Sequence, residues 1–227
     1  MSHLDIELQQ LKIESIKMWS LVNLQLRKGK ECLLKLDKDL AREVILSERR
    51  VNAYELKLDR DCENIFALFN PVAVDLRFVL AVLKINTNLE RTGDIVEGIA
   101  RFVLNVDNTF DTKLLELTRV VEMYTAANTM MESVLEAFDK EDTALARKIF
   151  KEDELLDDIN IKANAIVAAY VQNQPANVVE AALYLLSIIR KLERVGDQAK
   201  NMAEEIIFYI EAKVLKHRSK IEKADEK

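Results

Sequence analysis

One six-residue sequence occurs twice in this chain with a single residue changed. LERTGD occupies residues 89–94, and LERVGD occupies residues 192–197, which is 103 positions later. If these stretches are helical, the Glu and Asp of each copy lie on one face, and like charges at that spacing destabilise a helix by roughly 0.2–0.5 kcal/mol. The interior Gly costs about 1 kcal/mol more than Ala. A bound cation would offset the repulsion, and close approach of another backbone would explain the Gly. A solvated acidic face, with the Gly serving helix packing, is the alternative.

Other short sequences recur at nearly the same interval. LAR at residues 40–42 reappears at 145–147, and an amide followed by proline occurs at 70–71 and again at 174–175. A repeat of this length is too long for a solenoid. The pattern therefore predicts a duplicated domain.

The composition agrees with a helical protein. Only 4 Gly and 2 Pro occur among 227 residues, whereas 49% of the residues are hydrophobic and 32% are charged. Each half contains three stretches with apolar residues at helical spacing, which predicts an all-α fold. We expect a tandem duplication of an antiparallel three-helix bundle, with six long helices. The predicted repeats are residues 1–108 and 109–215, followed by a charged C-terminal tail at 216–227.

Polar residues and prolines mark where the predicted helices begin and end. Asp39 is the expected N-cap of the second helix, Pro71 suits the first turn of the third, and Asp142 or Thr143 is expected to cap the fifth. The six helices are predicted at about residues 4–38, 39–69, 71–105, 114–138, 142–173 and 176–210.

A second pair of polar positions lies on the middle helix of each half. Asp153 and Asp157 are four residues apart, and the matching positions in the first half are Glu48 and Asn52. In each half, the pairs on the second and third helices are equally far from the proline turn, so they are expected to face each other. This predicts a cluster of up to four acidic side chains in each half. The candidate metal ligands are Glu48, Asn52, Glu90, Asp94, Asp153, Asp157, Glu193 and Asp197.

Clusters of carboxylate oxygens suit hard cations such as Mg²⁺, Mn²⁺, Ca²⁺ or ferric iron. The only histidines are His3 and His217, near the two ends, and no Glu-x-x-His pair is present. A ferritin-like di-iron oxidase or a zinc hydrolase would therefore lack its nitrogen ligands. No nucleophile–base set and no glycine-rich phosphate loop stands out, so we assign no catalytic or cofactor-binding residues. The sequence favours a metal-binding scaffold over an enzyme.

Charge and cysteine content bound the environment of the protein. The net charge is −6, and no basic patch is dense enough to predict a nucleic-acid partner. Cys32 and Cys62 are far apart in the sequence and are expected to be buried thiols of a reducing compartment. We find no secretory signal, and amides and a proline interrupt the longest uncharged run, so no membrane insertion is expected. The predicted localisation is cytoplasmic.

Several motifs together resemble the PhoU family of bacterial phosphate-signalling regulators. They are NPVAVDLR at residues 70–77, LERTGD at 89–94, and RKLERVGD at 190–197 followed by NMAE at 201–204. The resemblance implies a cytoplasmic protein, often a homodimer, that binds metal ions (iron, zinc or another divalent cation) at the carboxylate clusters. It also implies a negative regulator of phosphate uptake and phosphate-starvation signalling. Its implied partners are a sensor histidine kinase and the ATPase of the phosphate transporter.

Three positions of the first half depart from the family pattern. Asn52 stands where the family usually has Asp, Asn88 where Asp commonly precedes Leu-Glu-Arg, and Gly98 where Asn follows the motif. The first cluster is therefore expected to bind metal more weakly than the second. The alternative function is that of a structural or accessory helical subunit of another phosphate transporter, with vestigial acidic clusters.

Overall fold

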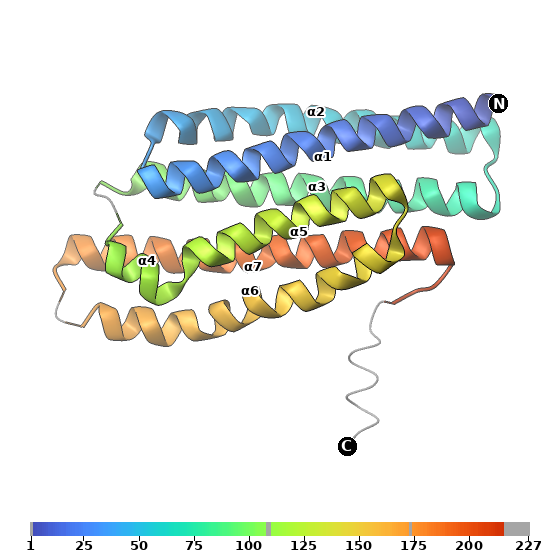
Figure 1. Ribbon diagram of the computed structural model, residues 1–227. Helices are drawn as coiled ribbons and strands as arrows, with labels where there is room; N and C mark the ends of the chain where they lie inside the picture. The colour runs from blue at the N-terminus through green and yellow to red at the C-terminus, as the bar shows by residue number, and fades with distance from the viewer. Residues whose placement is uncertain (1, 108–109, 173, 216–227) are drawn as a thin grey trace, which may run out of the picture.

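The computed structural model describes residues 2–107, 110–172 and 174–215, which form seven α-helices. The predicted all-α fold is confirmed. The helices run back and forth along one direction, and the described part of the chain is elongated (Figure 1). Their bounds are α1 His3–Lys35, α2 Lys38–Phe69, α3 Ala73–Asn105, α4 Thr112–Thr118, α5 Val120–Lys140, α6 Thr143–Tyr170 and α7 Ala176–Glu211.

Side-chain caps fix where the first two helices begin. Ser2 and Asp5 form a capping box at the start of α1, in which each side chain accepts a hydrogen bond from the other residue's backbone N–H. At the start of α2, the Asp37 carboxylate accepts a hydrogen bond from the Leu40 N–H at 2.9 Å. The prediction that Asp39 caps this helix is therefore wrong. Asp39 lies in the first turn, where its negative charge interacts favourably with the positive end of the helix dipole.

The two proline turns differ in detail. Asn70 ends α2 in the left-handed region at a φ of 46°, and α3 begins only at Ala73, so the prediction that Pro71 lies in its first turn is wrong. Three residues outside the helices, Asn70, Pro71 and Val72, reverse the chain there. In the second half, Pro175 stands directly before α7, and its carbonyl accepts a hydrogen bond from the Val178 N–H at 3.0 Å.

The predicted fourth helix is interrupted at Arg119. This residue separates α4 from α5 and adopts a left-handed backbone at a φ of 54°. Its N–H donates to the carbonyl of Glu116 at 3.1 Å, which closes a tight turn. Apolar spacing does not reveal the break, because Leu114 and Val120 on either side of it both remain buried. The following helix, α6, is capped by Asp142, as predicted.

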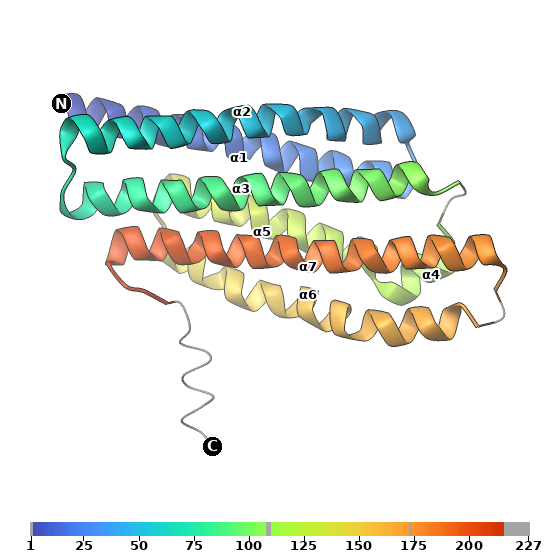
Figure 2. The same cartoon turned by 180° about the vertical axis from the view of Figure 1, so that it is seen from behind.

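The two halves meet through their last helices. In Figure 2, α2, α3, α7 and α6 lie side by side in that order, with α1, α4 and α5 behind them. Helix α3 packs on α1, α2 and α7, and α7 packs on α3, α5 and α6. Because the two LER-x-GD sequences lie on α3 and α7, both candidate clusters are placed on the helices that join the halves.

Aromatic side chains extend one core across this junction. Trp19 of α1 lies 5.6 Å from Phe138 of α5, measured between ring centroids, and Phe138 lies 6.3 Å from Tyr209 of α7. Tyr209 also contacts Phe78 of α3 edge-on at 5.5 Å. Pairs in this range contribute about 0.5–1.5 kcal/mol each beyond their buried area. The halves therefore share a hydrophobic core.

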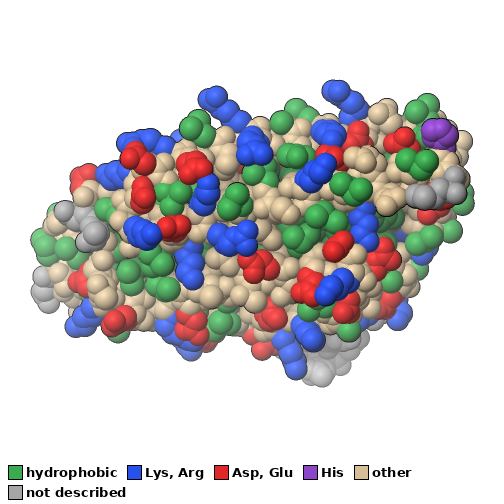
Figure 3. Space-filling view, turned by 45° about the horizontal axis from the view of Figure 1, so that its top comes forward, with side chains coloured by type: hydrophobic (Ala, Val, Ile, Leu, Met, Phe, Trp, Pro, Cys, Tyr) green, Lys and Arg blue, Asp and Glu red, His purple; other side chains and the backbone are tan. Residues whose placement is uncertain are grey.

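Several further predictions concern the rest of the chain. Cys32 and Cys62 are free and buried, as expected, and burial raises the pKa of each thiol to about 12. Among the described helices, none has an apolar stretch long enough to cross a membrane. On the face drawn in Figure 3, acidic and basic side chains are interspersed. The predicted tail at 216–227 lies outside the described residues, and the repeat boundary at 108–109 stays a prediction.

Candidate functional site

The first cluster is centred on the contact between Glu48 of α2 and Gly93 of α3. A Cβ atom at residue 93 would lie 2.7 Å from the Glu48 Oε2 atom and 3.2 Å from a methyl carbon of Val51. Gly93 is therefore required by side chains of the neighbouring helix, not by close approach of its backbone as the sequence suggested. The contact also places Glu48 level with the LERTGD sequence, as the equal distances from the proline turn predict.

Glu48 is a buried carboxylate with incomplete hydrogen bonding. Its exposed fraction is 5%, and the Gln25 Nε2 atom donates to its Oε2 atom at 2.9 Å. Its Oε1 atom has no hydrogen-bond partner in the part of the chain that the structure describes. Burial raises the pKa of Glu48 to about 7, and the charges of Asp94, Glu97 and Glu90 add to the increase, whereas the bond from Gln25 opposes it. The site thus carries more negative charge than its surroundings neutralise.

The other predicted ligands of the first cluster lie nearer the surface. Glu90 is partly buried, and burial raises its pKa, with the charge of Asp94 as the second cause. Asp94 and Asn52 are both exposed. The structure therefore brings Glu48, Glu90 and Asp94 into electrostatic contact and leaves Asn52 at the surface of α2.

The second cluster repeats the central contact with a shorter acid. A Cβ atom at residue 196 would lie 2.5 Å from the Asp153 Oδ1 atom and 2.8 Å from a methyl carbon of Leu156. Asp153 has an exposed fraction of 3%, and its Oδ1 atom has no hydrogen-bond partner among the described residues. Asp153 is thus the counterpart of Glu48 in burial, in its glycine contact and in its unpartnered oxygen.

A lysine lies inside the second cluster. The Lys200 ammonium donates to Asp153 and to the Asp197 Oδ1 atom, the latter at 2.8 Å. Burial lowers the pKa of Lys200, but the two hydrogen bonds outweigh burial and raise it above its ordinary value. Burial raises the pKa of Asp153, while Lys200 opposes that increase. The contact between Lys200 and Asp153 links α6 to α7.

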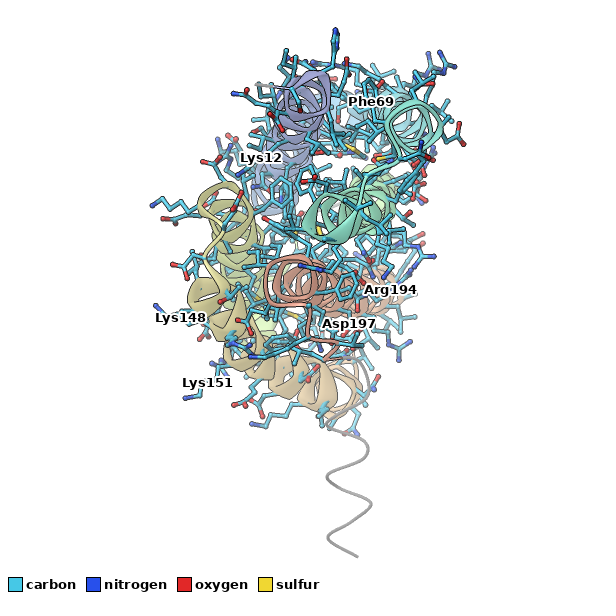
Figure 4. The ribbon with its side chains drawn as sticks, turned by 90° about the vertical axis from the view of Figure 1, so that its right-hand side faces the viewer. Lys12, Phe69, Lys148, Lys151, Arg194 and Asp197 are labelled. Carbon is cyan, nitrogen blue, oxygen red and sulfur yellow. The ribbon has the colours of Figure 1, made fainter. Side chains whose placement is uncertain are left out.

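Glu193 and Asp157 complete the second cluster. Both are partly buried, and burial raises the pKa of Glu193, with the charges of Asp197 and Asp157 as further causes. In Figure 4, Arg194 and Asp197 lie on one side of the molecule, and Lys148 and Lys151 lie on the opposite side. All four predicted ligands of the second half thus belong to one group of interacting carboxylates.

The two clusters differ in how well they suit a cation. Among the described residues, no three Asp, Glu, His or Cys side chains lie close enough together to form a ready metal site. Both clusters nevertheless offer a buried oxygen that has no hydrogen-bond partner among the described residues, at Glu48 in the first and at Asp153 in the second, which suits a hard cation. In the second cluster, the positive charge is already supplied by Lys200.

Comparison with known proteins decides the family. The model of the PhoU domain matches residues 16–103 and again residues 120–206. The chain belongs to the PhoU family. One relative, the phosphate-specific transport system accessory protein PhoU homolog 1 of Thermotoga maritima, is 31% identical over 214 residues, covering 94% of this chain and 91% of that protein.

Solved PhoU structures share the fold over nearly their whole length. The crystal structure of PhoU from Pseudomonas aeruginosa superposes with a TM-score of 0.86 at 26% identity, covering 93% of this chain and all of that chain. The phosphate transport system regulatory protein PhoU from Streptococcus pneumoniae gives a TM-score of 0.84 at 25% identity, covering 94% and 99%. The predicted tandem bundle is therefore the architecture of the PhoU family.

Sequence reasoning missed three residues that shape the clusters. Gln25 comes from α1, and no motif marks it because it bonds to Glu48 only through packing of distant segments. Lys200 and Glu97 each follow the motif Asp by three residues, so aligning the two PhoU repeats would have paired them. At this aligned position the first half has the anionic Glu97 and the second half has the cationic Lys200.

Proposed function

We propose that this chain is an accessory and regulatory protein of a phosphate transport system. The observation that carries the proposal is the match of both halves to the PhoU domain, together with full-length agreement in fold with PhoU structures. The relatives are named accessory or regulatory proteins of phosphate transport. We assign this chain the role of a negative regulator of phosphate uptake and of phosphate-starvation signalling.

The regulator is proposed to act through contacts with other proteins and not by catalysis. Its proposed partners are a sensor histidine kinase and the ATPase of the phosphate transporter, and its proposed state is a cytoplasmic homodimer. The support for this is the family membership and an elongated bundle whose two halves share a core. Such a scaffold presents long helix faces to partner surfaces.

Metal binding at the carboxylate clusters is part of the proposal. In the first half, Glu48, Glu90 and Asp94 would hold the ion, with iron, zinc or another divalent cation as candidates. A bound cation would supply positive charge to these acids and tie α2 to α3. The buried unpartnered Oε1 atom of Glu48 supports this assignment. Gln25 orients the Glu48 carboxylate through its hydrogen bond at 2.9 Å.

A reporter strain tests the regulatory role. Deleting the chain is expected to switch on phosphate-starvation genes in cells with ample phosphate. A variant carrying Glu90→Ala and Asp94→Ala should give expression between that of the wild type and the deletion. The control is Glu63→Ala, which removes an exposed acid elsewhere on α2. Unchanged starvation-gene expression in the full deletion would reject the regulatory proposal.

The alternative is an accessory subunit of another phosphate transporter, with clusters that no longer bind metal. Lys200 favours it, because its ammonium already pairs with two carboxylates of the second cluster. Affinity capture of the tagged chain from cells with ample phosphate separates the two functions. Recovery of a sensor kinase supports the regulator, whereas recovery of transporter subunits without a kinase supports the alternative.

A further inference from the structure

Two carboxylates hold the ammonium of Lys200 in the second cluster. It contacts a carboxylate of α6, Asp153, and one of its own helix, Asp197. The Asp153 side chain is 4% exposed and that of Lys200 is 26% exposed, so the contact is largely shielded from solvent. A lysine held in this way supplies the charge that a bound cation would otherwise supply.

The equivalent position in the first cluster has the opposite charge. Glu97 follows Asp94 by three residues, as Lys200 follows Asp197. The Glu97 carboxylate pairs with Arg101 one turn further along α3, at 2.6 Å. Glu97 thus adds a carboxylate beside Glu48 and compensates for the acid lost at Asn52.

One cation approaches the first cluster from α7, but it does not enter it. Burial lowers the pKa of Lys191, the charges of Asp94 and Glu97 oppose that decrease, and the Lys191 ammonium forms no ion pair with either carboxylate. It lies over the ring of Phe102, 5.7 Å from the centroid. Within the described residues, no lysine therefore pairs with Glu48, Glu90 or Asp94, and Glu97 pairs with Arg101 of its own helix.

We propose that Lys200 is the built-in cation of the second cluster, and that only the first cluster takes up a metal ion from solution. This inference rests on the metal binding assigned under the proposed function and reverses the order of affinity expected from Asn52 alone. Lys200 then holds α6 against α7 whether or not metal is present. Metal availability would then affect the packing of α2 against α3 alone. The first half would respond to metal concentration, whereas the contact between α6 and α7 would not.

Titration of Mn²⁺ into the chelator-treated full-length chain tests the proposal, with calorimetry and elemental analysis as readouts. Introduced into the wild-type background, Glu90→Gln should weaken Mn²⁺ binding by at least the roughly 10- to 100-fold that loss of an outer-shell partner costs, and Glu193→Gln should leave Mn²⁺ binding unchanged. Lys200→Gln should add Mn²⁺ binding, and combining it with Glu193→Gln should abolish that addition. The matched control is Lys148→Gln, on the exposed side of α6.

The reciprocal variant and the melting temperature distinguish a change in metal binding from a failure to fold. Glu97→Lys should reduce Mn²⁺ binding at the first cluster, as Lys200 does at the second. Lys200→Gln should melt at a lower temperature than the wild type without metal, because it leaves Asp153 buried and unpaired. Glu97 is partly exposed and lies outside the second cluster, so the Glu97→Lys variant is expected to fold. It therefore tests in a folded protein whether a lysine at this position excludes Mn²⁺.

Three results would overturn the inference. One is a loss of wild-type Mn²⁺ binding on Glu193→Gln as large as that on Glu90→Gln. Another is an unchanged amount of bound Mn²⁺ in a folded Lys200→Gln variant. The third is a wild type that binds no Mn²⁺ at all, which also removes metal from the proposed function. The regulatory role would still stand or fall by the reporter strain, so the two failures are distinguishable.

Discussion

Glu48 and Asp153 hold equivalent positions but meet different partners. Each fills the space beside a motif glycine and each has one unpartnered oxygen. Glu48 is bonded by the neutral amide of Gln25, whereas Asp153 is bonded by the charged Lys200. A buried carboxylate without a counter-charge is costly, and burial accordingly raises the pKa of Glu48 to about 7.

The metal-free protein should lose stability as pH rises through the titration of Glu48. Its folded-state pKa of about 7 lies above the ordinary 4.5, so the folded state binds the proton more tightly. The contribution of Glu48 to the free energy of unfolding should therefore be largest below about pH 4.5 and fall until about pH 7, by at most ~3 kcal/mol. Glu48→Gln should remove that part of the slope in urea unfolding at several pH values.

The comparison of Glu48→Gln with wild type isolates Glu48, since Glu90 and Glu193 titrate in both proteins. Glu63→Gln is the control, because Glu63 is exposed on the same helix. An identical pH slope in Glu48→Gln and wild type would show that Glu48 does not titrate in this range. The groups that face Glu48 are Gln25 from α1 and Glu90, Asp94 and Glu97 from α3.

Two glycines should respond oppositely to alanine. At Gly196 the new methyl would meet Asp153 and Leu156, both buried, so we expect Gly196→Ala to destabilise the protein by about 1–3 kcal/mol. At Gly98 it would meet only the end of the flexible Lys191 side chain. Gly98→Ala should therefore be neutral or stabilising by up to about 1 kcal/mol through helix propensity. Equal destabilisation of both variants in thermal melts would contradict this.

Among the elements, the break between α4 and α5 is the main difference between the halves. Arg119 occupies the left-handed region without being Gly, Asn or Asp. Its guanidinium pairs with Glu122 at 2.8 Å and with Asp158 at 3.6 Å, but these pairs are exposed and contribute little. The bend is therefore maintained by packing on either side of it, at the expense of local backbone strain.

Substitution of Arg119 should reveal that strain. We expect Arg119→Gly to be more stable than Arg119→Ala by about 1 kcal/mol, because Gly adopts the left-handed conformation without a Cβ penalty. Both variants lose the same ion pairs, so their difference reports the backbone alone. Chemical unfolding of the two proteins side by side measures it. If Arg119→Ala proved the more stable of the two, the turn would not be strained.

For the whole molecule, the decisive feature is the packing of α3 against α7. This contact joins the two repeats, and the aromatic cluster from Trp19 to Tyr209 continues across it. A shared core predicts that the repeats unfold together although each has its own three-helix bundle. We therefore expect the duplicated chain to unfold as one cooperative unit and not as two linked domains.

Leu156→Ala tests this cooperativity. Leu156 is fully buried in α6, so the change should lower the free energy of unfolding by about 2–5 kcal/mol. Trp19, the only tryptophan, reports on the first half by fluorescence, while circular dichroism reports on all helices. Both signals should shift to the same lower midpoint. A tryptophan transition that stays at the wild-type midpoint would show that the halves unfold independently.

The sequence alone determined the features that depend on spacing along the chain. Helical periodicity and scarce glycine and proline set the all-α class, and the recurrence of LER-x-GD set the duplication. Counting from the proline turns placed Glu48 against the first motif and Asp153 against the second, because antiparallel neighbours bring residues equally far from a turn to one level. These relations hold within a helix or between two helices joined by a short turn.

Only the tertiary structure decided the features that depend on packing between distant segments. The bend at Arg119 carries no glycine or proline signal, and the bond from Gln25 to Glu48 joins α1 to α2 across a packed core. The sequence shows that residue 200 is a lysine, but whether its ammonium points toward Asp153 or toward solvent depends on the position of α6. A long, flexible side chain takes its conformation from its surroundings, and those surroundings are fixed only when the helices pack.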